Sequence, residues 1–221
     1  MMNEAPLRLV NTTLPPILTG ATFDFEKGSI TAIVAGSGEN CAMLLEAFLG
    51  MRAASGGCVE VFGEDPGNLS ESRLRLLRSR IGVHIYGGGL ISNLKAVENV
   101  TLPLLHHSSE KAVFIFEKAL HALTLVGYMG DPFAPPGRLS AFQRAAVGMA
   151  RVVAIDPGLV ICDRLGDGLP AAQQKSLVDM ALDLHWKAPG RTTVLLFPDP
   201  DAIPGGDASI TVLNLSEGGL L

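Results

Sequence analysis

The sequence predicts an α/β fold in which one α/β core is interrupted by a mostly helical insertion. The first part of the chain has the order strand, glycine-containing turn, helix and strand, with which α/β folds that bind phosphate begin. The middle part is dominated by helical periodicity and by a proline- and glycine-rich loop at residues 130–138. Strands and a long helix alternate again from residue 159 onward. We therefore expect a single domain over residues 1–221, with a helical subdomain inserted at residues 68–154.

The individual elements follow from the spacing of apolar residues. Short apolar or alternating runs predict strands at residues 7–10, 22–25, 29–34, 57–62, 81–86, 159–163, 192–197 and 210–215. Apolar residues at helical spacing predict helices at residues 41–50, 111–126, 141–155 and 171–186. Ser70 is placed to cap a further helix, and a glycine-rich loop, GGGLIS, precedes an apolar segment at residues 96–105.

Composition limits the classes of function. The chain has 221 residues, a formal net charge of -5, 48% hydrophobic residues and a mean hydropathy of +0.33. No apolar run approaches the ~20 residues that span a bilayer, and the first ten residues do not have the pattern of a signal peptide. The apolar content favours a deep core or a partner surface, and the mild acidity argues against a general nucleic-acid binder. The odd, scattered set of cysteines (Cys41, Cys58 and Cys162) is typical of reduced thiols in the cytoplasm and has no metal-site spacing.

Four segments carry motif-like residues in a fixed order. They read AGSGENCAMLL from residue 35, IGVHIYGGGLISNLKAVENVTLPLL from 81, RLSAFQRAAVGMARVVAIDPGLVICD from 138 and TTVLLFPDP from 192. In order and spacing they resemble the phosphate loop, the Q-loop region, the signature motif with the Walker B strand, and the H-loop strand of ABC-transporter nucleotide-binding domains. The last three most resemble ATPase subunits of MCE-type, Mla-like lipid transporters. The resemblance runs from about residue 7 to the C-terminus. It implies a P-loop NTPase-like ABC ATPase fold with a mixed β core, flanking helices and a helical subdomain.

The first segment departs from the phosphate loop that it resembles. A working loop reads G-x-x-G-x-G-K-[ST]: its amides cradle phosphates, its lysine reaches the outer phosphates and its hydroxyl binds magnesium. This chain has Asn40 for the last glycine, Cys41 for the lysine and Ala42 for the hydroxyl residue. The degenerate loop that we expect consists of Ala35, Gly36, Ser37, Gly38, Glu39, Asn40, Cys41 and Ala42. Taken alone, the segment could also be an ordinary glycine-bearing turn between a strand and a helix.

The Walker B segment is retained only in part. Asp163 ends an apolar strand, where the resemblance implies that it would hold a magnesium-bound water. The next residue in the family is a catalytic glutamate, and here it is Arg164, which stays protonated and cannot act as a base. One interpretation is an ordinary surface arginine. The sharper hypothesis is that Arg164 occupies the place of the missing cations and pairs with Asp163 or Glu39.

The remaining motif positions also differ from the family. The signature motif LSGGQ is represented by Leu139, Ser140, Ala141, Phe142 and Gln143, in which Ser140 can cap a helix but Phe142 replaces a glycine. The sequence could equally be a plain helix start. Tyr86 stands for the Q-loop glutamine, Pro198 for the H-loop histidine and Pro170 for the last aspartate of the D-loop. The stretch between the first two strands, NTTLPPILTG, has no aromatic residue to stack on adenine.

These differences predict a non-catalytic subunit. We expect no catalytic residue and no metal ligand set, no bound ATP or Mg²⁺ cofactor, and a site filled by Phe142, Tyr86, Arg164 and Pro198. The resemblance implies that residues 81–105 form the groove that receives the membrane permease. We therefore expect a cytoplasmic subunit held peripherally at the inner membrane, with a second copy or a paralogous ATPase subunit as partner. No nucleic-acid partner is expected. The alternatives are a repurposed module that binds a nucleotide or another anion without hydrolysis, and an atypical but active ATPase.

Overall fold

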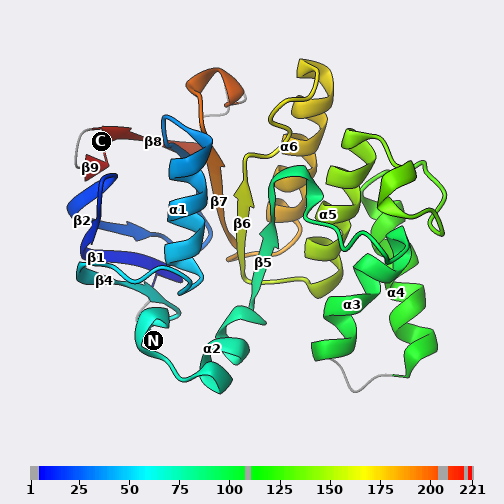
Figure 1. Cartoon of the computed structure of the whole chain (residues 1–221), viewed down its shortest axis with the longest axis horizontal. Coiled ribbons are helices and arrows are strands. Elements are labelled where there is room, and N and C mark those ends of the chain that lie inside the picture. The colour runs from blue at the N-terminus through cyan, green and yellow to red at the C-terminus, as the bar shows by residue number, and fades with distance from the viewer. Residues whose placement is uncertain (1–4, 108–110, 204–208, 217–218, 221) are drawn as a thin grey trace. The chain divides into compact units, whose positions relative to one another are not determined.

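The structure is a computed structural model that describes residues 5–107, 111–203, 209–216 and 219–220. The chain divides into two compact units (Figure 1). The first unit comprises residues 1–81, 158–164 and 188–221, and the second comprises residues 82–157 and 165–187. The single domain with a helical insertion at residues 68–154 stays a prediction.

The first unit contains a small antiparallel sheet in the order β2-β1-β4. Its strands are β1 (Leu7–Leu14), β2 (Leu18–Phe25) and β4 (Gly56–Val61). The predicted antiparallel pairing is confirmed, but β1 continues beyond its predicted end at residue 10. The reason is a register shift between Leu9 and Thr12, where Asn11 has a positive φ of 48°. Such an irregularity breaks the alternation of side chains on which the prediction depended, while the hydrogen-bonded pairing goes on.

The strands of the second sheet that belong to this unit follow the order β6-β7-β3-β8-β9; β6, β7, β3 and β8 are parallel, and β9 is antiparallel to β8. Its strands are β3 (Ile30–Val34), β6 (Leu159–Asp163), β7 (Thr192–Phe197), β8 (Ile210–Ser216) and β9 (Gly219–Leu220). Every residue of β3, β6 and β7 is buried, as expected of central parallel strands. The predicted mixed β core is confirmed.

Helix α1 (Gly38–Phe48) contacts both sheets of the first unit, through β4 on one side and β6 and β7 on the other. The Phe48 ring lies edge-on to the Phe25 ring of β2, with 6.0 Å between the ring centroids. Two shorter helical elements follow β4 in the same unit, η1 (Pro66–Asn68) and α2 (Glu71–Arg78), and η4 (Pro200–Ala202) follows β7. Ser70 caps α2 by accepting a hydrogen bond from the backbone N–H of Arg73, as predicted.

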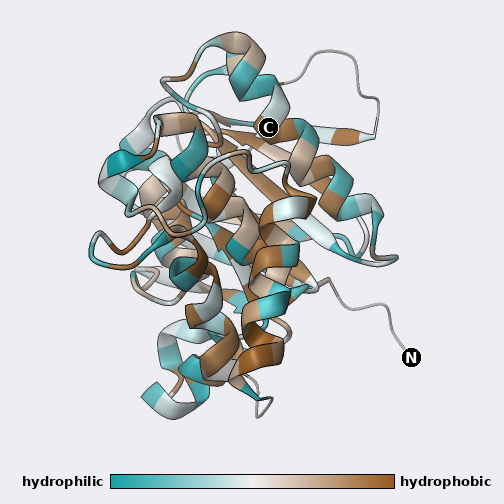
Figure 2. Cartoon of the chain, turned by 90° about the vertical axis from the view of Figure 1, so that its right-hand side faces the viewer, coloured by the Kyte–Doolittle hydropathy of each residue, from teal (hydrophilic) through white to brown (hydrophobic). Residues whose placement is uncertain are grey.

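The second unit is helical apart from most of β5. Its elements are β5 (Ile81–His84), η2 (Tyr86–Gly88), α3 (Ala96–His107), α4 (Ala112–Leu125), η3 (Pro136–Arg138), α5 (Ala141–Ile155) and α6 (Ala171–Trp186). Helices α3, α4 and α5 pack against one another, and hydrophobic and hydrophilic residues alternate along them (Figure 2). The apolar segment at residues 96–105, identified from the sequence, lies within helix α3. Within the described residues, no helix is both long and apolar enough to cross a membrane.

Candidate functional site

The turn between β3 and α1 holds the segment that resembles a phosphate loop. The backbone N–H of Ala35 donates to the Phe197 carbonyl at 2.8 Å, which ties the turn to the end of β7. The Ser37 hydroxyl accepts from the Asn40 backbone N–H at 3.1 Å and caps α1. This cap explains why the helix begins at Gly38, three residues earlier than predicted. Gly36 has a φ of 78°, a left-handed conformation that glycine adopts without strain.

Asn40 has a structural role that sequence reasoning missed. Its side-chain amide nitrogen donates to the Ala35 carbonyl at 2.7 Å, across the turn. From the sequence it could be identified only as the replacement of a glycine. The side chain therefore stabilises this particular turn from within, which a glycine at the same position could not do.

The neighbouring positions carry side chains other than those of the phosphate loop that the segment resembles. Cys41 is fully buried, so its thiol lies in the core and not at the turn where a lysine would extend. Ala42 offers only a methyl group to the position of a metal-binding hydroxyl. Glu39 is exposed in the first turn of α1, where the helix dipole favours a carboxylate, and it forms no ion pair within the described part of the chain.

Arg164 follows the last residue of β6 and is held by its own backbone. Its N–H donates to the Leu196 carbonyl at 2.9 Å, and its φ is 48°, an uncommon value for a residue with a side chain. The guanidinium Nε lies 3.7 Å from a carboxylate oxygen of Asp163. The Asp163 side chain is 5% exposed and that of Arg164 is 23% exposed. Of the two acidic partners predicted for Arg164, the structure therefore places Asp163 beside it.

The same guanidinium lies against the first turn of α1. A Cβ added to Gly38 would meet Arg164 Nη1, with Cζ at 3.1 Å and Cδ at 3.3 Å. A cation at a helix N-terminus is normally unfavourable, because the free N–H groups there carry partial positive charge. The buried Asp163 carboxylate compensates for this charge. Arg164, Asp163 and Gly38 thus form one group of contacts, which we call the Arg164 cluster.

The other predicted site residues divide between the two units. Pro198 directly follows β7 in the first unit, is partly exposed, and carries no side-chain hydrogen-bonding group. Tyr86 and Phe142 belong to the second unit, so the first unit brings only Pro198 and Arg164 to the phosphate-loop edge of its sheet. Tyr86 is 44% exposed at the start of η2. Among the described residues, no cluster of three or more His, Cys, Asp or Glu side chains could hold a metal ion.

The segment that resembles the signature motif forms the start of α5. Ser140 accepts from the backbone N–H of Gln143 at 3.2 Å, and the Gln143 side chain accepts from the backbone N–H of Ser140 at 2.9 Å. This capping box confirms the predicted role of Ser140. Leu139 is buried and Ala141 is exposed. Phe142 lines a largely apolar cavity of about 320 Å³ together with Tyr128 and Met129.

The segment at residues 81–105 is organised by buried polar groups that the sequence did not reveal. The Asn99 side chain is 1% exposed; it accepts from the backbone N–H of Ile91 and donates to the carbonyls of Ile91, Leu94 and Lys95. Arg151 of α5 donates to the carbonyls of Gly88 and Gly89 at 2.6 and 2.9 Å. Burial lowers the pKa of Arg151. The predicted glycine-rich loop at residues 87–92 is therefore held at its start by hydrogen bonds from α5.

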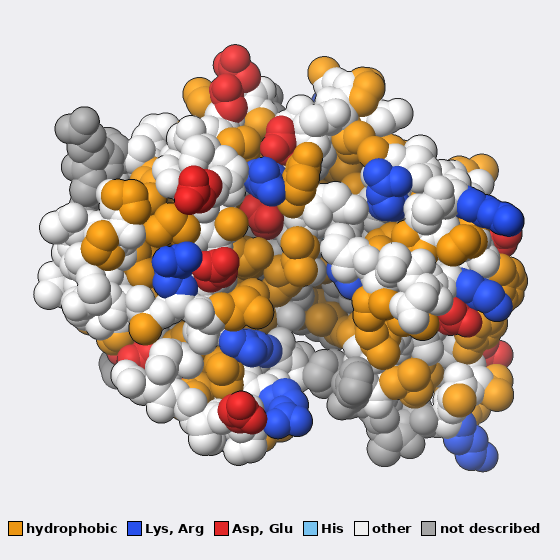
Figure 3. All heavy atoms as spheres, in the orientation of Figure 1, with side chains coloured by type: hydrophobic (Ala, Val, Ile, Leu, Met, Phe, Trp, Pro, Cys, Tyr) orange, Lys and Arg blue, Asp and Glu red, His pale blue; other side chains and the backbone are white. Residues whose placement is uncertain are grey.

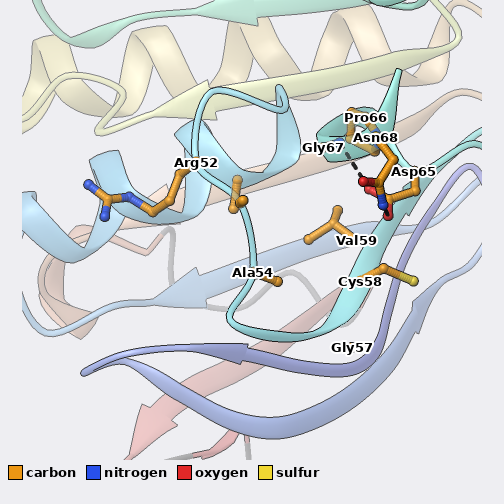
Figure 4. Close-up of a pocket in the computed structure, with 11 residues that line it drawn as sticks. Arg52, Ala54, Gly57, Cys58, Val59, Asp65, Pro66, Gly67 and Asn68 are labelled. Atoms are coloured by element: carbon orange, nitrogen blue, oxygen red, sulfur yellow. Dashed lines mark hydrogen bonds between the residues drawn. The ribbon is translucent and has the colours of Figure 1, made fainter. Parts of the chain in front are cut away.

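A second cavity lies at the opposite end of α1, lined by Arg52, Cys58, Asp65 and small residues around them (Figure 4). The Asp65 carboxylate accepts from the Gly67 N–H at 2.9 Å and from the Asn68 side-chain amide at 2.7 Å. Arg52 extends away from Asp65 and pairs with Glu46. Burial raises the pKa of the Cys58 thiol, and Asp65 adds to this effect. The polar groups of this cavity therefore do not converge on a common ligand.

One known protein family matches most of the chain. Residues 18–164 match the model of the family described as ABC transporter, which is about two thirds of the chain. The chain belongs to the ABC transporter family. Relatives to which it is similar are named as ATP-binding proteins.

Two curated relatives show how similar this ABC family member is to known proteins. It is 30% identical over 188 residues to the methionine import ATP-binding protein MetN of Mannheimia succiniciproducens, which covers 84% of this chain and 53% of that protein. It is 27% identical over 164 residues to the "Probable ribonucleotide transport ATP-binding protein mkl" of Mycobacterium leprae, covering 74% and 47% of the two chains. The chain therefore spans about half the length of the curated relatives that it matches.

Solved ABC structures share its fold. A bacterial ABC transporter cassette described as dimeric is 22% identical, with a TM-score of 0.83 over 97% of this chain and 96% of the other. The cbiO1 protein of Clostridium perfringens, described as part of the ABC transporter complex cbiONQ, is 21% identical, with a TM-score of 0.83 over 99% and 87%. The predicted ABC ATPase fold is confirmed.

Proposed function

We propose that this chain is the cassette subunit of an ABC transporter and that its own phosphate loop does not support ATP hydrolysis. The observation that carries the proposal is the Arg164 cluster. The family's catalytic glutamate stands directly after the Walker B aspartate, and here that position holds a guanidinium 3.7 Å from Asp163. Because arginine stays protonated, it cannot deprotonate an attacking water.

The residues around the turn do not fit a bound magnesium ion. Magnesium prefers several oxygen ligands at near-octahedral geometry, usually one or two carboxylates, water and phosphate oxygens. Asp163 offers the only carboxylate of the Walker B pair, and the Arg164 guanidinium already lies beside it. Ala42 has no hydroxyl and Cys41 is buried. A dication next to this guanidinium would be strongly repelled, so no hydrolytic step is assigned to the site.

Docking on a membrane permease is the role that remains. The segment at residues 81–105 carries exposed apolar side chains, which are Ile85, Tyr86, Ile91 and Leu105. Exposed apolar groups held on an ordered backbone favour a protein partner. We propose that this segment receives the permease at the cytoplasmic side of the inner membrane, and that the chain acts as a homodimer or beside a paralogous ATPase subunit. A lipid-type substrate is proposed from the sequence resemblance to MCE-type transporters alone.

The comparisons favour a second candidate, in which the chain is an ATP-binding and active subunit of unusual sequence. Its relatives are named ATP-binding proteins, and the Ser37-capped start of α1 keeps the strand–turn–helix geometry to which phosphates bind in such folds. A third candidate, a module that holds a nucleotide without magnesium, is favoured by Arg164, because a guanidinium at the turn can form charge-assisted hydrogen bonds to phosphate.

Thermal unfolding with nucleotide separates the three candidates. Ligand at 100 times its Kd stabilises a protein by about 2.7 kcal/mol, which is readily measured. The non-catalytic proposal predicts no shift of Tm with millimolar ATP or ADP, with or without Mg²⁺. A shift that requires Mg²⁺ would contradict it and support the active subunit. A shift that is independent of Mg²⁺ and lost in Arg164→Ala would support the nucleotide-holding module.

A further inference from the structure

A cavity of about 320 Å³ lies in the second unit, where the loop that follows α4 meets the start of α5. The side chains that line it belong to Tyr128, Met129, Ser140, Phe142, Gln143 and Ala146. Pockets that hold small organic molecules have volumes of about 300–1,000 Å³. The cavity is therefore large enough for a small ligand.

Two aromatic rings and a thioether make the lining of this cavity largely apolar. Phe142 stands where the signature motif has a glycine, so its ring is a feature of this chain's own sequence. Phe142 and Tyr128 are both partly buried, whereas Met129 is 94% exposed, so the cavity is open to solvent beside Met129. A thioether is flexible and makes favourable contacts with aromatic rings. Such a lining favours a planar aromatic ligand, because aromatic rings attract one another beyond the effect of buried area.

Two polar groups of the lining residues converge at Gly130. A Cβ added to Gly130 would meet both the Tyr128 hydroxyl and Gln143 Nε2, the latter at 2.9 Å. The Tyr128 hydroxyl donates to the Asp131 carbonyl at 3.1 Å, and Gln143 Oε1 accepts from the Ser140 N–H at 2.9 Å. The second bond fixes the Gln143 amide. Its Nε2 forms no hydrogen bond within the described part of the chain, so it can donate to a ligand.

Other exposed apolar side chains of the second unit lie outside this cavity. Figure 3 shows hydrophobic side chains over the helical part of the chain, with Lys and Arg side chains among them. Leu105 of α3 and Phe114 of α4 are 52% and 54% exposed, and neither lines the cavity. Single exposed apolar side chains are common on protein surfaces. The cavity differs from them because it combines a hollow, two aromatic rings and a fixed donor.

We propose that this cavity binds a small, neutral, planar aromatic molecule that carries a hydrogen-bond acceptor. The Phe142 and Tyr128 rings and the Met129 thioether contact the apolar part of the ligand, and Gln143 Nε2 donates to its acceptor. An apolar side chain of a protein partner would fill the hollow but would bury the amide without an acceptor, which is unfavourable. The proposal does not depend on whether the chain hydrolyses ATP.

Titration of the whole chain with quinoline, a neutral aromatic molecule with one acceptor nitrogen, tests the proposal. NMR of the chain labelled with ¹³C at its methionine methyl groups reports the binding. The Met129 resonance, identified by its loss in Met129→Leu, should shift and saturate with a Kd of about 1 mM. The resonance of Met51, which is 66% exposed in the first unit, should not shift.

Two variants should raise the Kd for quinoline. Phe142→Ala removes one aromatic ring of the lining and should weaken binding about fivefold. Gln143→Glu keeps the oxygen that accepts from the Ser140 N–H, and with it the capping box, but removes the amide donor. It should also weaken binding about fivefold, because the quinoline nitrogen would then face a carboxylate in place of a donor.

The matched control is Phe114→Ala, which removes an aromatic ring of the same unit from outside the cavity. It should leave the Kd almost unchanged, and circular dichroism should show all variants folded. No saturable shift of Met129 at about ten times the expected Kd, equal shifts of Met51 and Met129, or an unchanged Kd in both Phe142→Ala and Gln143→Glu would each overturn the proposal. A Met129 shift caused by raising the chain concentration, with loss of quinoline binding, would also overturn it and assign the cavity to a second copy.

Discussion

Arg164 is the residue on which the proposed loss of ATP hydrolysis depends most. The side chain lies in a position with two opposing electrostatic neighbours: the Asp163 carboxylate, which attracts it, and the first turn of α1, which repels it. Its backbone is also left-handed, with a φ of 48°. A residue kept in an uncommon conformation with a buried ionic neighbour is held there by its surroundings, and substitutions can separate the two contributions.

Replacing Arg164 should destabilise the fold by an amount that depends on the new residue. Arg164→Ala leaves the buried Asp163 carboxylate without this guanidinium, so we expect the free energy of unfolding to fall by about 1–3 kcal/mol. Arg164→Gly removes the same guanidinium but relieves the left-handed backbone, and it should be about 0.5–1 kcal/mol more stable than Arg164→Ala. Urea denaturation of both variants measures the difference. If Arg164→Gly were the less stable of the two, the backbone contribution would be refuted.

At the scale of elements, the contact between η2 and α5 fixes the start of the proposed permease segment. Gly88 has a φ of 89°, and a Cβ at this position would overlap the carbonyl of Arg144. Gly87 is also left-handed, with a φ of 68°, but a Cβ there would meet nothing within 4 Å. The two adjacent glycines therefore differ in packing and not in backbone conformation, which makes them a matched pair.

Alanine substitutions of these glycines should differ in effect. Gly87→Ala introduces only left-handed strain and should cost about 1 kcal/mol of unfolding free energy. Gly88→Ala adds an overlap with backbone atoms that cannot rotate away, and should cost about 3 kcal/mol or more and loosen the Arg151 hydrogen bonds. Chemical denaturation measures both costs, and hydrogen exchange at residues 87–92 reports the loosening. Equal costs for the two variants would contradict the packing described for Gly88.

Buried His84 of β5 should make the free energy of unfolding depend on pH. Its Nε2–H donates to the Ala145 carbonyl at 3.1 Å, and burial lowers its pKa from 6.5 to about 4. Between these values the unfolded chain binds a proton that the folded chain does not. The free energy of unfolding should therefore fall as the pH drops from about 6.5 to about 4, by about 3 kcal/mol in all.

Denaturation at several pH values checks this expectation. The variant His84→Gln keeps a side-chain donor but does not titrate, so it should lose most of the pH dependence in that window. His121→Gln, at an exposed histidine of α4, should keep it. A profile for His84→Gln that parallels the unsubstituted chain would assign the pH dependence to other groups.

For the molecule as a whole, sequence patterns predicted correctly those structural features that depend on the spacing of nearby residues. The buried strands at residues 159–163 and 192–197 and the helix at residues 171–186 were predicted with their observed ends. The Ser140 cap was also predicted, because a capping serine and its partner are three residues apart. The bulge at Asn11 was missed, since it interrupts the very alternation from which strands are recognised.

The candidate site was less predictable because its contacts join distant segments. The change from Glu to Arg at position 164 could be identified from the resemblance, but the direction of the side chain toward Gly38 depends on the pairing of β6 with β7 and on the left-handed backbone. The Asn40 hydrogen bond to Ala35 and the Asn99 contacts require a folded turn and a folded loop. Residue identity alone does not show which carbonyl such an amide will reach.

The most direct test of the central claim is ATP turnover by the purified chain at saturating ATP and Mg²⁺, measured beside an Asp163→Asn variant. Since single catalytic or charge-stabilising groups contribute about 10²–10⁴-fold each to rate, the combined replacements predict phosphate release at the background rate for both proteins. Turnover clearly above background in the unsubstituted chain, abolished by Asp163→Asn, would contradict the account and establish an active ATPase with an unusual site.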